Sequence, residues 1–274
     1  MKTLLETLLA IARDAAHLIS GVYATQFTVD YKSPRDPVTD ADRRANDLSC
    51  TRLAREFPGV PIVAEESDPS TFSGFSVAPR IFFVDPLDGT REFVEKNGEF
   101  AVMIGLVDAA RAAAGVIFAP ASRIGWAGSG DDGAWTIGPN GDRAPIRTSE
   151  VADLSRARVV ASRSHRTEAL EQALSLLGVR ELVTLGSAGL KGAEVATGRA
   201  EAYVAPGFAG QRWDACAADA IVTAAGGRFT DAFGSPIDYR HSSLGNDKGL
   251  LASNARVHEQ ILRRLEPVRG RQPQ

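Results

Sequence analysis

The chain has 274 residues, of which 44% are hydrophobic and 24% charged, with a formal net charge of -3. This is the balance of a globular protein with a sizeable core, and the lack of a basic field argues against binding nucleic acid or an anionic membrane through general electrostatics. Two cysteines, Cys50 and Cys216, and four histidines exclude a cysteine-rich zinc site and offer no disulfide framework, so we expect a cytoplasmic protein.

The first predicted element is an amphipathic helix at the N-terminus. Charged residues interrupt its apolar pattern, so it is expected to be neither a signal peptide nor a membrane span, and no other stretch is long enough to cross a bilayer. Its apolar residues recur at helical spacing and form a core-facing stripe: Leu4, Leu8, Ile11, Ala15, Leu18 and Val22.

A loop at residues 31–38 and a second helix at residues 40–57 are predicted next. Thr39 is its expected N-cap, and Asp42 is then the third helical residue, as in a capping box with Asp in place of Glu or Gln. The alternative is that Asp42 orients a hydroxyl group or a metal-bound water. The sequence leaves both roles open.

A short strand at residues 60–64 ends at Glu65 and Glu66. Because side chains alternate along a strand, we expect these two acids to point to opposite faces, so that only one enters a site. The following stretch, residues 68–79, is rich in Ser, Pro and Gly, and is predicted to be a flexible surface segment, either a lid or an inert loop.

The central motif is Asp85-Pro86-Leu87-Asp88-Gly89-Thr90, which follows the apolar strand predicted at residues 80–84. A turn of this length brings the two carboxylates to one side, where at about 4 Å they would repel by roughly 4 kcal/mol. A hard divalent cation, with the Leu87 carbonyl as a further oxygen ligand, would offset that repulsion. The alternative is a tight turn in which Asp and Gly serve only backbone geometry.

An antiparallel meander is predicted after this motif. A polar connection at residues 93–99 precedes it, and its strands are expected at residues 100–107, 112–119, 124–127 and 133–138. The turn at residues 139–143 marks the expected boundary between two halves, residues 1–140 and 141–274.

The second half alternates strands and helices, as an α/β unit does. Ligands of such sheets collect at strand ends and helix starts, and Ser162, His165, Ser187 and Lys191 all fall there. Each also has a structural explanation: an N-cap serine, a loop histidine or a solvated lysine. Asp214, in the first turn of a helix from Trp213 to about Ala225, is favoured by the helix dipole whatever its function.

Taken together, these motifs resemble the inositol monophosphatase superfamily of lithium-sensitive, magnesium-dependent phosphatases. The resemblance rests on Glu65-Glu66-Ser67, on the Asp85 to Thr90 motif, and on Trp213-Asp214 before an Ala-rich helix and Gly-Gly, in matching order and spacing. It covers nearly the whole chain. It implies a mixed α+β fold, a layered α-β-α-β-α sandwich with most metal ligands in the first half and the substrate-binding residues and Asp214 in the second.

Further features are similar to the 3′(2′),5′-bisphosphate nucleotidase branch of that superfamily, which acts in sulfur metabolism. They are the continuation Thr90-Arg91-Glu92-Phe93, the stretch Asn97-Gly98-Glu99-Phe100, Ser162-Arg163-Ser164-His165, and the segment from Gly186 to Lys191. The branch removes one phosphate from 3′-phosphoadenosine 5′-phosphate. The segment 206–211 departs from inositol-specific members, because it has no acid where they often place one.

The resemblance also implies roles for individual residues. Two or three Mg²⁺ ions would be held by Glu65, Asp85, the Leu87 carbonyl, Asp88 and Asp214. Glu65, Thr90 and Asp42 would be catalytic, with Thr90 and Asp42 helping to deprotonate the attacking water. The substrate would be contacted by Gly89, Thr90, Ser162, His165, Ser187, Lys191 and Asp214.

The expected partner is therefore a small phosphorylated molecule, and the chain is expected to be a monomer or homodimer. Two alternatives remain open from the sequence. One is an inositol, histidinol or related sugar monophosphatase. The other is a catalytically silent metal or phosphate sensor, which would have no need of a water-activating pair such as Thr90 and Asp42.

Overall fold

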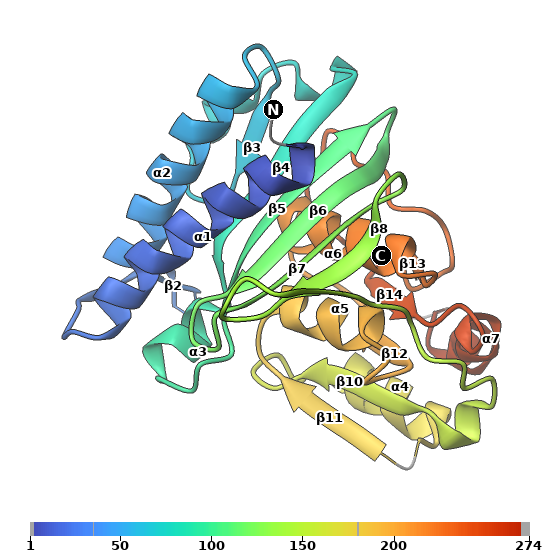
Figure 1. The fold of residues 1–274 in the computed structure, drawn as a ribbon. Helices are drawn as coiled ribbons and strands as arrows, with labels where there is room; N and C mark the ends of the chain where they lie inside the picture. Colours follow the sequence, from blue (N-terminus) through green and yellow to red (C-terminus); the bar gives the residue numbers. More distant parts are fainter. Residues whose placement is uncertain (1–2, 35, 180, 270–274) are drawn as a thin grey trace.

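A computed structural model describes residues 3–34, 36–179 and 181–269, and its first elements are the two helices expected from the sequence. They are α1, Leu4–Tyr23, and α2, Asp40–Glu56. Both begin with a capping box, formed by Thr3 with Glu6 and by Thr39 with Asp42. They lie side by side on one face of a large sheet (Figure 1), where their apolar stripes are buried.

The large sheet has seven strands in the order β3-β4-β5-β6-β7-β8-β9, antiparallel throughout except for the parallel pair β3 and β4. The predicted meander is confirmed. A short last strand, Arg143–Pro145, was not expected. The strands are β3 Ile62–Ala64, β4 Arg80–Asp88, β5 Ala101–Asp108, β6 Arg111–Ala119, β7 Ile124–Ser129, β8 Gly133–Ile137 and β9 Arg143–Pro145.

A second, mixed sheet has five strands in the order β11-β10-β12-β14-β13. The pairs β10–β11 and β10–β12 are parallel, as the α/β alternation predicts, and the pairs with β14 are antiparallel. The strands are β10 Arg158–Ser162, β11 Glu181–Leu185, β12 Ala202–Ala205, β13 Arg228–Thr230 and β14 Leu250–Ser253.

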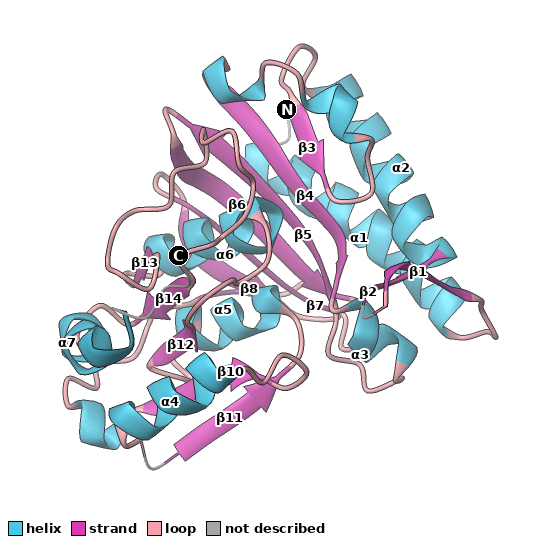
Figure 2. Ribbon diagram, turned by 180° about the vertical axis from the view of Figure 1, so that it is seen from behind, coloured by secondary structure: helices cyan, strands magenta, loops and turns pink. Residues whose placement is uncertain are grey.

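Two helices, α5 (Ala188–Ala196) and α6 (Arg212–Ala224), lie between the sheets, and α4 (Glu168–Leu177) and α7 (His258–Arg269) cover the outer face of the smaller one (Figures 1 and 2). The predicted layered α-β-α-β-α sandwich is confirmed. Close approach of α6 to the large sheet requires glycine, since a Cβ on Gly115 would lie 2.4 Å from the Ala217 carbonyl oxygen.

The polar stretch at residues 31–38 was predicted to be a loop and instead forms a hairpin, β1 (Val29–Ser33) with β2 (Asp36–Thr39). The prediction was wrong because most of the hairpin is exposed and lacks apolar alternation. Pro37 is compatible with this two-stranded ribbon, which has free edges on both sides.

Three other connections are more ordered than expected. Residues 68–79 form two short 3₁₀ turns, Pro69–Phe72 and Phe75–Val77, anchored by buried Phe72 and Phe75. The connection before β5 begins with a short helix, α3, Thr90–Val94. The expected polar tail from residue 266 begins inside α7, and residues 270–274 lie outside the described residues.

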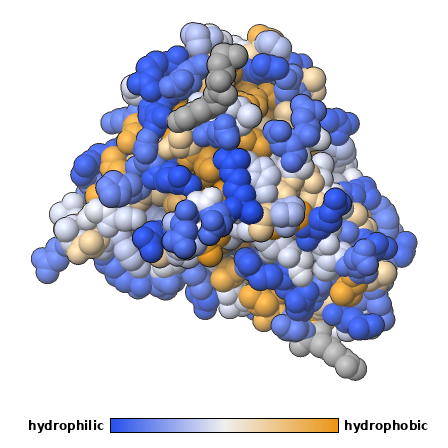
Figure 3. All heavy atoms as spheres, in the orientation of Figure 1, coloured by the Kyte–Doolittle hydropathy of each residue, from blue (hydrophilic) through white to orange (hydrophobic). Residues whose placement is uncertain are grey.

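The division into halves at residue 140 stays a prediction. The two parts are in close contact, because α6 from the second part packs on β4 to β8 of the first. Within the described ranges, none of the helices has the length and apolar character that a bilayer span requires. On the face seen in Figure 3, polar and charged residues predominate and apolar residues show in small patches.

Candidate active site

The Asp85–Thr90 motif lies at the end of β4, where the ladder to β5 contains a bulge. Asp85 pairs with Met103 and Asp88 with Ala101, so three steps along β4 match two along β5. In a regular strand, residues three apart point to opposite faces, and the extra residue brings both carboxylates to the same side. The strand therefore does not end at Asp85, as the sequence had suggested, but continues to Asp88.

Asp214 joins these two acids from the first turn of α6. One oxygen from each of Asp85, Asp88 and Asp214 lies within 4.8 Å of the others, and Asp85 and Asp88 are buried. The Oδ2 atom of Asp214 also accepts the N–H of Gln211 at 2.5 Å, which caps α6. Asp214 thus has both the helix-start role and a place in the acidic cluster.

The electrostatics of this cluster call for a cation. Burial, and then the charges of Glu65, Asp88 and Asp214, raise the pKa of Asp85 well above its usual value. Burial, followed by the charges of Asp88 and Glu65, does the same for the pKa of Asp214. Asp85 and Asp214, whose charged forms are disfavoured in this way, form with Asp88 a set of oxygen ligands that suits a hard divalent ion.

Glu65 lies beside this cluster, although it is not one of the three mutually close acids. Burial raises its pKa to about 7, an effect that Lys32 opposes. The Nζ atom of Lys32, on the hairpin, donates to Glu65 Oε1 at 2.9 Å and also to Glu66. The two glutamates were predicted to point to opposite faces. They reach one ammonium group because the chain turns after Ala64, where Ser67 N–H donates to the Ala64 carbonyl at 3.1 Å.

Thr90 and Asp42 are in direct contact. The Oγ1 atom of Thr90 donates to Asp42 Oδ1 at 2.9 Å and lies 3.1 Å from the Leu87 carbonyl oxygen. The other oxygen of Asp42 accepts the Thr39 N–H at 2.7 Å. Asp42 therefore fills both roles left open by the sequence, since one oxygen caps α2 and the other holds the Thr90 hydroxyl. Burial raises the pKa of Asp42.

Gly89 makes the change of direction from β4 to α3. Its φ is +95°, and a Cβ there would lie 2.9 Å from the Glu99 carbonyl oxygen. Only glycine adopts this conformation and fits this space without strain. The expected contacts of the Gly89 and Thr90 N–H groups with a phosphate stay a prediction.

Ser187 and Lys191 are held by the protein itself at the start of α5. Ser187 Oγ donates to Asp88, and the Gly189 N–H donates to Asp88 Oδ2 at 2.7 Å. Lys191 is 4% exposed, and its Nζ atom donates to the carbonyls of Gly186 and Ser187 at 3.1 and 2.8 Å. Burial lowers the pKa of Lys191. Ser187 thus contacts the acidic cluster through Asp88, whereas the Lys191 ammonium group is bonded to backbone carbonyls.

Ser162 and His165 lie together on the loop after β10. Ser162 Oγ accepts the His165 N–H at 3.0 Å, and the His165 side chain is exposed. Desolvation, followed by the charges of Arg91 and Lys191, lowers the pKa of His165, with Glu92 and Asp88 opposing. The imidazole is therefore within electrostatic range of Asp88, one acid of the cluster.

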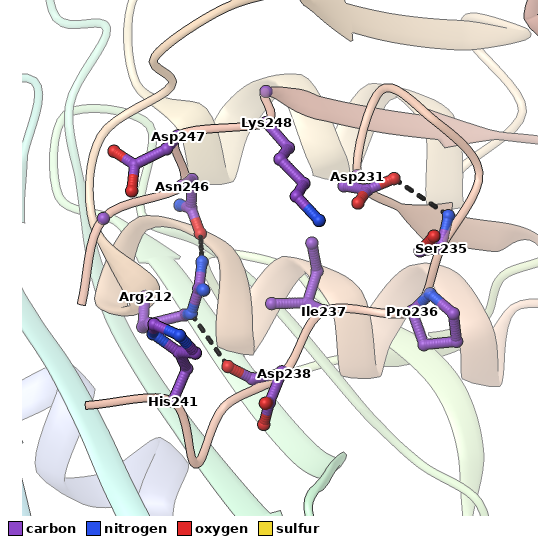
Figure 4. Close-up of a pocket in the computed structure, with 12 residues that line it drawn as sticks. Arg212, Asp231, Ser235, Pro236, Ile237, Asp238, His241, Asn246, Asp247 and Lys248 are labelled. Atoms are coloured by element: carbon purple, nitrogen blue, oxygen red, sulfur yellow. Dashed lines mark hydrogen bonds between the residues drawn. The ribbon is translucent and has the colours of Figure 1, made fainter. Parts of the chain in front are cut away.

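A separate pocket of about 250 Å³ is lined by none of the predicted site residues. It lies between the start of α6 and the loop before β14 (Figure 4). On its wall, the buried side chain of Asn246 donates to the carbonyls of Ala209 and Gln211 at 3.1 and 2.6 Å and accepts from Arg212. These bonds fix the backbone immediately before Asp214.

Sequence reasoning gave no role to Lys32, Glu92, Glu99 or Arg163. Lys32 lies in a polar stretch without a motif, and nothing in its surroundings in the sequence indicates that it reaches Glu65. The other three belong to segments that were singled out only for resemblance. Their partners lie more than 60 residues away in the chain.

Comparison with known proteins identifies the family of the chain. The model of the inositol monophosphatase family matches residues 1–269. The 3′(2′),5′-bisphosphate nucleotidase CysQ of Escherichia coli K12 is 35% identical over 243 residues, covering 86% of this chain and 94% of that protein. The protein of the same name from Buchnera aphidicola is also 35% identical, covering 88% of this chain and 89% of its own.

Solved structures show the same fold. The extragenic suppressor protein SuhB of Bartonella henselae superimposes with a TM-score of 0.82 at 26% identity, covering 95% of this chain and 97% of that one. The IMPase of Thermotoga maritima gives a TM-score of 0.80 at 26% identity and covers 95% of both chains.

The fold and the curated relatives define the chain as a phosphatase, and its acidic cluster offers oxygen ligands of the kind that suit a metal ion. Within that class, the chain belongs to the inositol monophosphatase family.

Proposed function

We propose that this chain is a magnesium-dependent phosphatase that removes the 3′-phosphate of 3′-phosphoadenosine 5′-phosphate, releasing AMP and phosphate. The observation that carries the proposal is the meeting of Asp85, Asp88 and Asp214 in one buried cluster beside the Thr90–Asp42 pair. The likeness to curated bisphosphate nucleotidases supports the choice of substrate.

The metal ligands proposed are the carboxylates of the cluster together with Glu65 and the Leu87 carbonyl. Two or three Mg²⁺ ions would supply a nucleophilic water and stabilise the departing alkoxide. The protein's own part is to hold at least three charges at close range in a buried place, at the cost of their mutual repulsion. Asp85, which lies near Glu65, Asp88 and Asp214, would be the central ligand of this set.

Thr90 and Asp42 are proposed to position and help deprotonate the attacking water. While the Thr90 hydroxyl donates to Asp42, its oxygen is free to accept a proton from a water molecule placed beside it. The raised pKa of Asp42 favours uptake of the proton that Thr90 passes on. No covalent phosphoryl intermediate is needed, because positioning and charge neutralisation supply most of the catalysis.

The proposed substrate contacts form two groups. Asp214, in the cluster, and the N–H groups of Gly89 and Thr90, next to it, would hold the reacting end of the substrate. The exposed imidazole of His165 and the adjacent Ser162 lie at the rim, where the rest of a nucleotide would be held. Ser187 would hold Asp88 in position, and Lys191 would supply positive charge near the substrate.

The alternative is an inositol-1-monophosphatase or a related sugar or histidinol phosphatase. Its support is the structural likeness to the Thermotoga maritima IMPase at 26% identity. A silent metal or phosphate sensor is disfavoured by the Thr90–Asp42 hydrogen bond, which a pure binding module does not require. Oligomeric state and cytoplasmic location stay predictions.

A substrate panel tests the proposal. We expect phosphate release to be fastest from 3′-phosphoadenosine 5′-phosphate, compared with inositol 1-phosphate, histidinol phosphate and fructose 1,6-bisphosphate. We expect His165→Ala to raise KM about tenfold for the nucleotide, with a much smaller change for inositol 1-phosphate, since loss of one good polar contact costs about 1.4 kcal/mol. A preference for inositol 1-phosphate, or equal losses on both substrates, would exclude the nucleotidase.

A further inference from the structure

One short segment, residues 88–99, carries three carboxylates that each hold a donor from the second part of the chain. Asp88 holds Ser187 and Gly189, as described above. Glu92 and Glu99 hold other groups and are not part of the acidic cluster. We call Glu92 and Glu99, with the groups that they bind, the carboxylate clamp.

Glu99 makes the more extensive contact. Arg163 approaches it with two nitrogens, Nε to Oε2 at 2.9 Å and Nη2 to Oε1 at 2.6 Å, and the Gly186 N–H donates to Oε2 at 2.7 Å. Arg163 Nη2 also donates to the Thr184 carbonyl at 2.9 Å. This two-pronged geometry is the strong form of an arginine–carboxylate pair.

The charge of Glu99 is favoured by these donors. Partial burial opposes ionisation, but the hydrogen bonds of Arg163 and Gly186 hold the pKa of Glu99 below its usual value. One carboxylate thereby ties together the ends of β10 and β11 and the chain that leads into β5.

Glu92 makes the second contact and is buried, with 2% exposure. It accepts a hydrogen bond from Ser164 Oγ. A Cβ on Gly186 would lie 2.3 Å from Glu92 Cγ, so the backbone of Gly186 passes directly over the Glu92 side chain. Asn97 N–H donates to the Glu92 carbonyl at 3.2 Å, which braces the segment between the two acids.

The clamped groups surround the rim of the site. Arg163 and Ser164 belong to the same tetrapeptide as Ser162 and His165, and Gly186 precedes the start of α5. On the other side, β5 pairs directly with the bulge that carries Asp88. The clamp therefore sets the distance between the metal-binding motif and the loop that bears His165.

We propose that Glu92 and Glu99 are positioning residues for the part of the substrate beyond the scissile phosphate. This inference rests on the proposed function in one respect, that the site hydrolyses a phosphate ester. Because the hydrogen bonds that the structure shows for these two carboxylates go to Arg163, Ser164 and Gly186 and not to the acidic cluster, we expect the clamp to act on substrate binding and to leave the chemical step intact. It makes the chain selective for substrates that reach both the metal site and the 162–165 loop.

The test compares a small ester with a large one. In Glu99→Gln, we expect KM for 3′-phosphoadenosine 5′-phosphate to rise about tenfold, while its kcat and the hydrolysis of p-nitrophenyl phosphate stay within twofold of wild type. Arg163→Gln should behave alike, and the double variant should be no worse than either single one, because both remove one interaction. Restoring the acid in Glu99→Asp should recover part of the loss.

Asp108→Asn is the matched control, since Asp108 pairs with Arg80 at 2.8 Å at the other end of β4 and β5. It should leave both substrates unaffected. If Glu99→Gln weakened hydrolysis of the small and the large ester equally, or if the increases in KM were additive in the double variant, the proposed role of the clamp would be wrong. If wild type prefers another large ester, the nucleotidase proposal fails, and the same comparison made with that ester still decides the clamp.

Discussion

Asp85 and Glu201 are both buried carboxylates, but their neighbours carry opposite charges. Asp85 is 1% exposed and faces Asp88, Asp214 and Glu65. Glu201 is 0% exposed and faces Arg158, whose backbone N–H, Nε and Nη2 groups all donate to it, at 2.6, 3.1 and 2.7 Å.

The pKa values reflect this difference. Burial and like charges raise the pKa of Asp85 well above its usual value. Burial also disfavours the charged form of Glu201, but the hydrogen bonds from Arg158 lower the pKa of Glu201 overall. Where a buried carboxylate only stabilises the fold, the chain supplies its own cation. Where several carboxylates face one another instead, the charged forms of Asp85 and Asp214 are disfavoured, and a bound cation, as proposed for Mg²⁺, would offset this.

The largest effect that tests this comparison is loss of activity in Asp88→Asn. Asparagine keeps the acceptor for Ser187 and Gly189 but removes one charge from the cluster. We expect magnesium-dependent phosphate release to fall by about 10³-fold or more while the fold persists. Phosphate release with circular dichroism as the fold control measures this. Turnover close to wild type would remove Asp88 from the proposed ligands.

A smaller effect, on stability, is expected for Glu201→Gln. The variant leaves the Arg158 charge without its carboxylate, so we expect the free energy of unfolding at pH 7 to fall by about 2 kcal/mol. Because the folded pKa of Glu201 is depressed, its contribution is present above the usual glutamate value of 4.5 and is lost as the pH falls through the folded value.

The free energy of unfolding, measured in urea, should therefore differ less between Glu201→Gln and wild type below about pH 4.5. Glu171→Gln serves as the control, because its pair with Arg166 is largely exposed and should contribute less than about 1 kcal/mol. A difference that stays constant down to acid pH would show that the charge of Glu201 is not responsible.

The smallest effect has the opposite sign. In EDTA at pH 7, Asp85→Asn should stabilise the protein by about 1 kcal/mol or more, since it removes a carboxyl group whose charged form is disfavoured by burial and by the neighbouring acids, while its amide oxygen still accepts the Leu87 N–H. Adding Mg²⁺ should raise Tm more for wild type than for the variant. Differential scanning fluorimetry measures both shifts. If Asp85→Asn were less stable than wild type in EDTA, repulsion within the acidic cluster would not destabilise the wild-type protein.

Much of the fold was predictable because its signals are local. The apolar spacing of α1, the capping pattern of Thr39 and Asp42, and the turn residues between meander strands act within a few residues of chain. The hairpin with Lys32 was missed because an exposed ribbon carries no apolar alternation. The common orientation of Glu65 and Glu66 was missed because the turn that follows Ala64 overrides strand alternation.

The sequence by itself determined which acids are present and that the motif from Asp85 to Thr90 places two of them three residues apart. That Asp214 joins them was expected from the resemblance alone, and its place depends on the packing of α6 on the large sheet and on the bulge in β4. Only the tertiary structure decided that Lys32, on the β1–β2 hairpin, reaches Glu65, and that Glu99 binds Arg163. Both contacts join residues that are far apart in the chain. Local chemistry cannot specify such contacts, because they depend on how two sheets and the helices between them fit together.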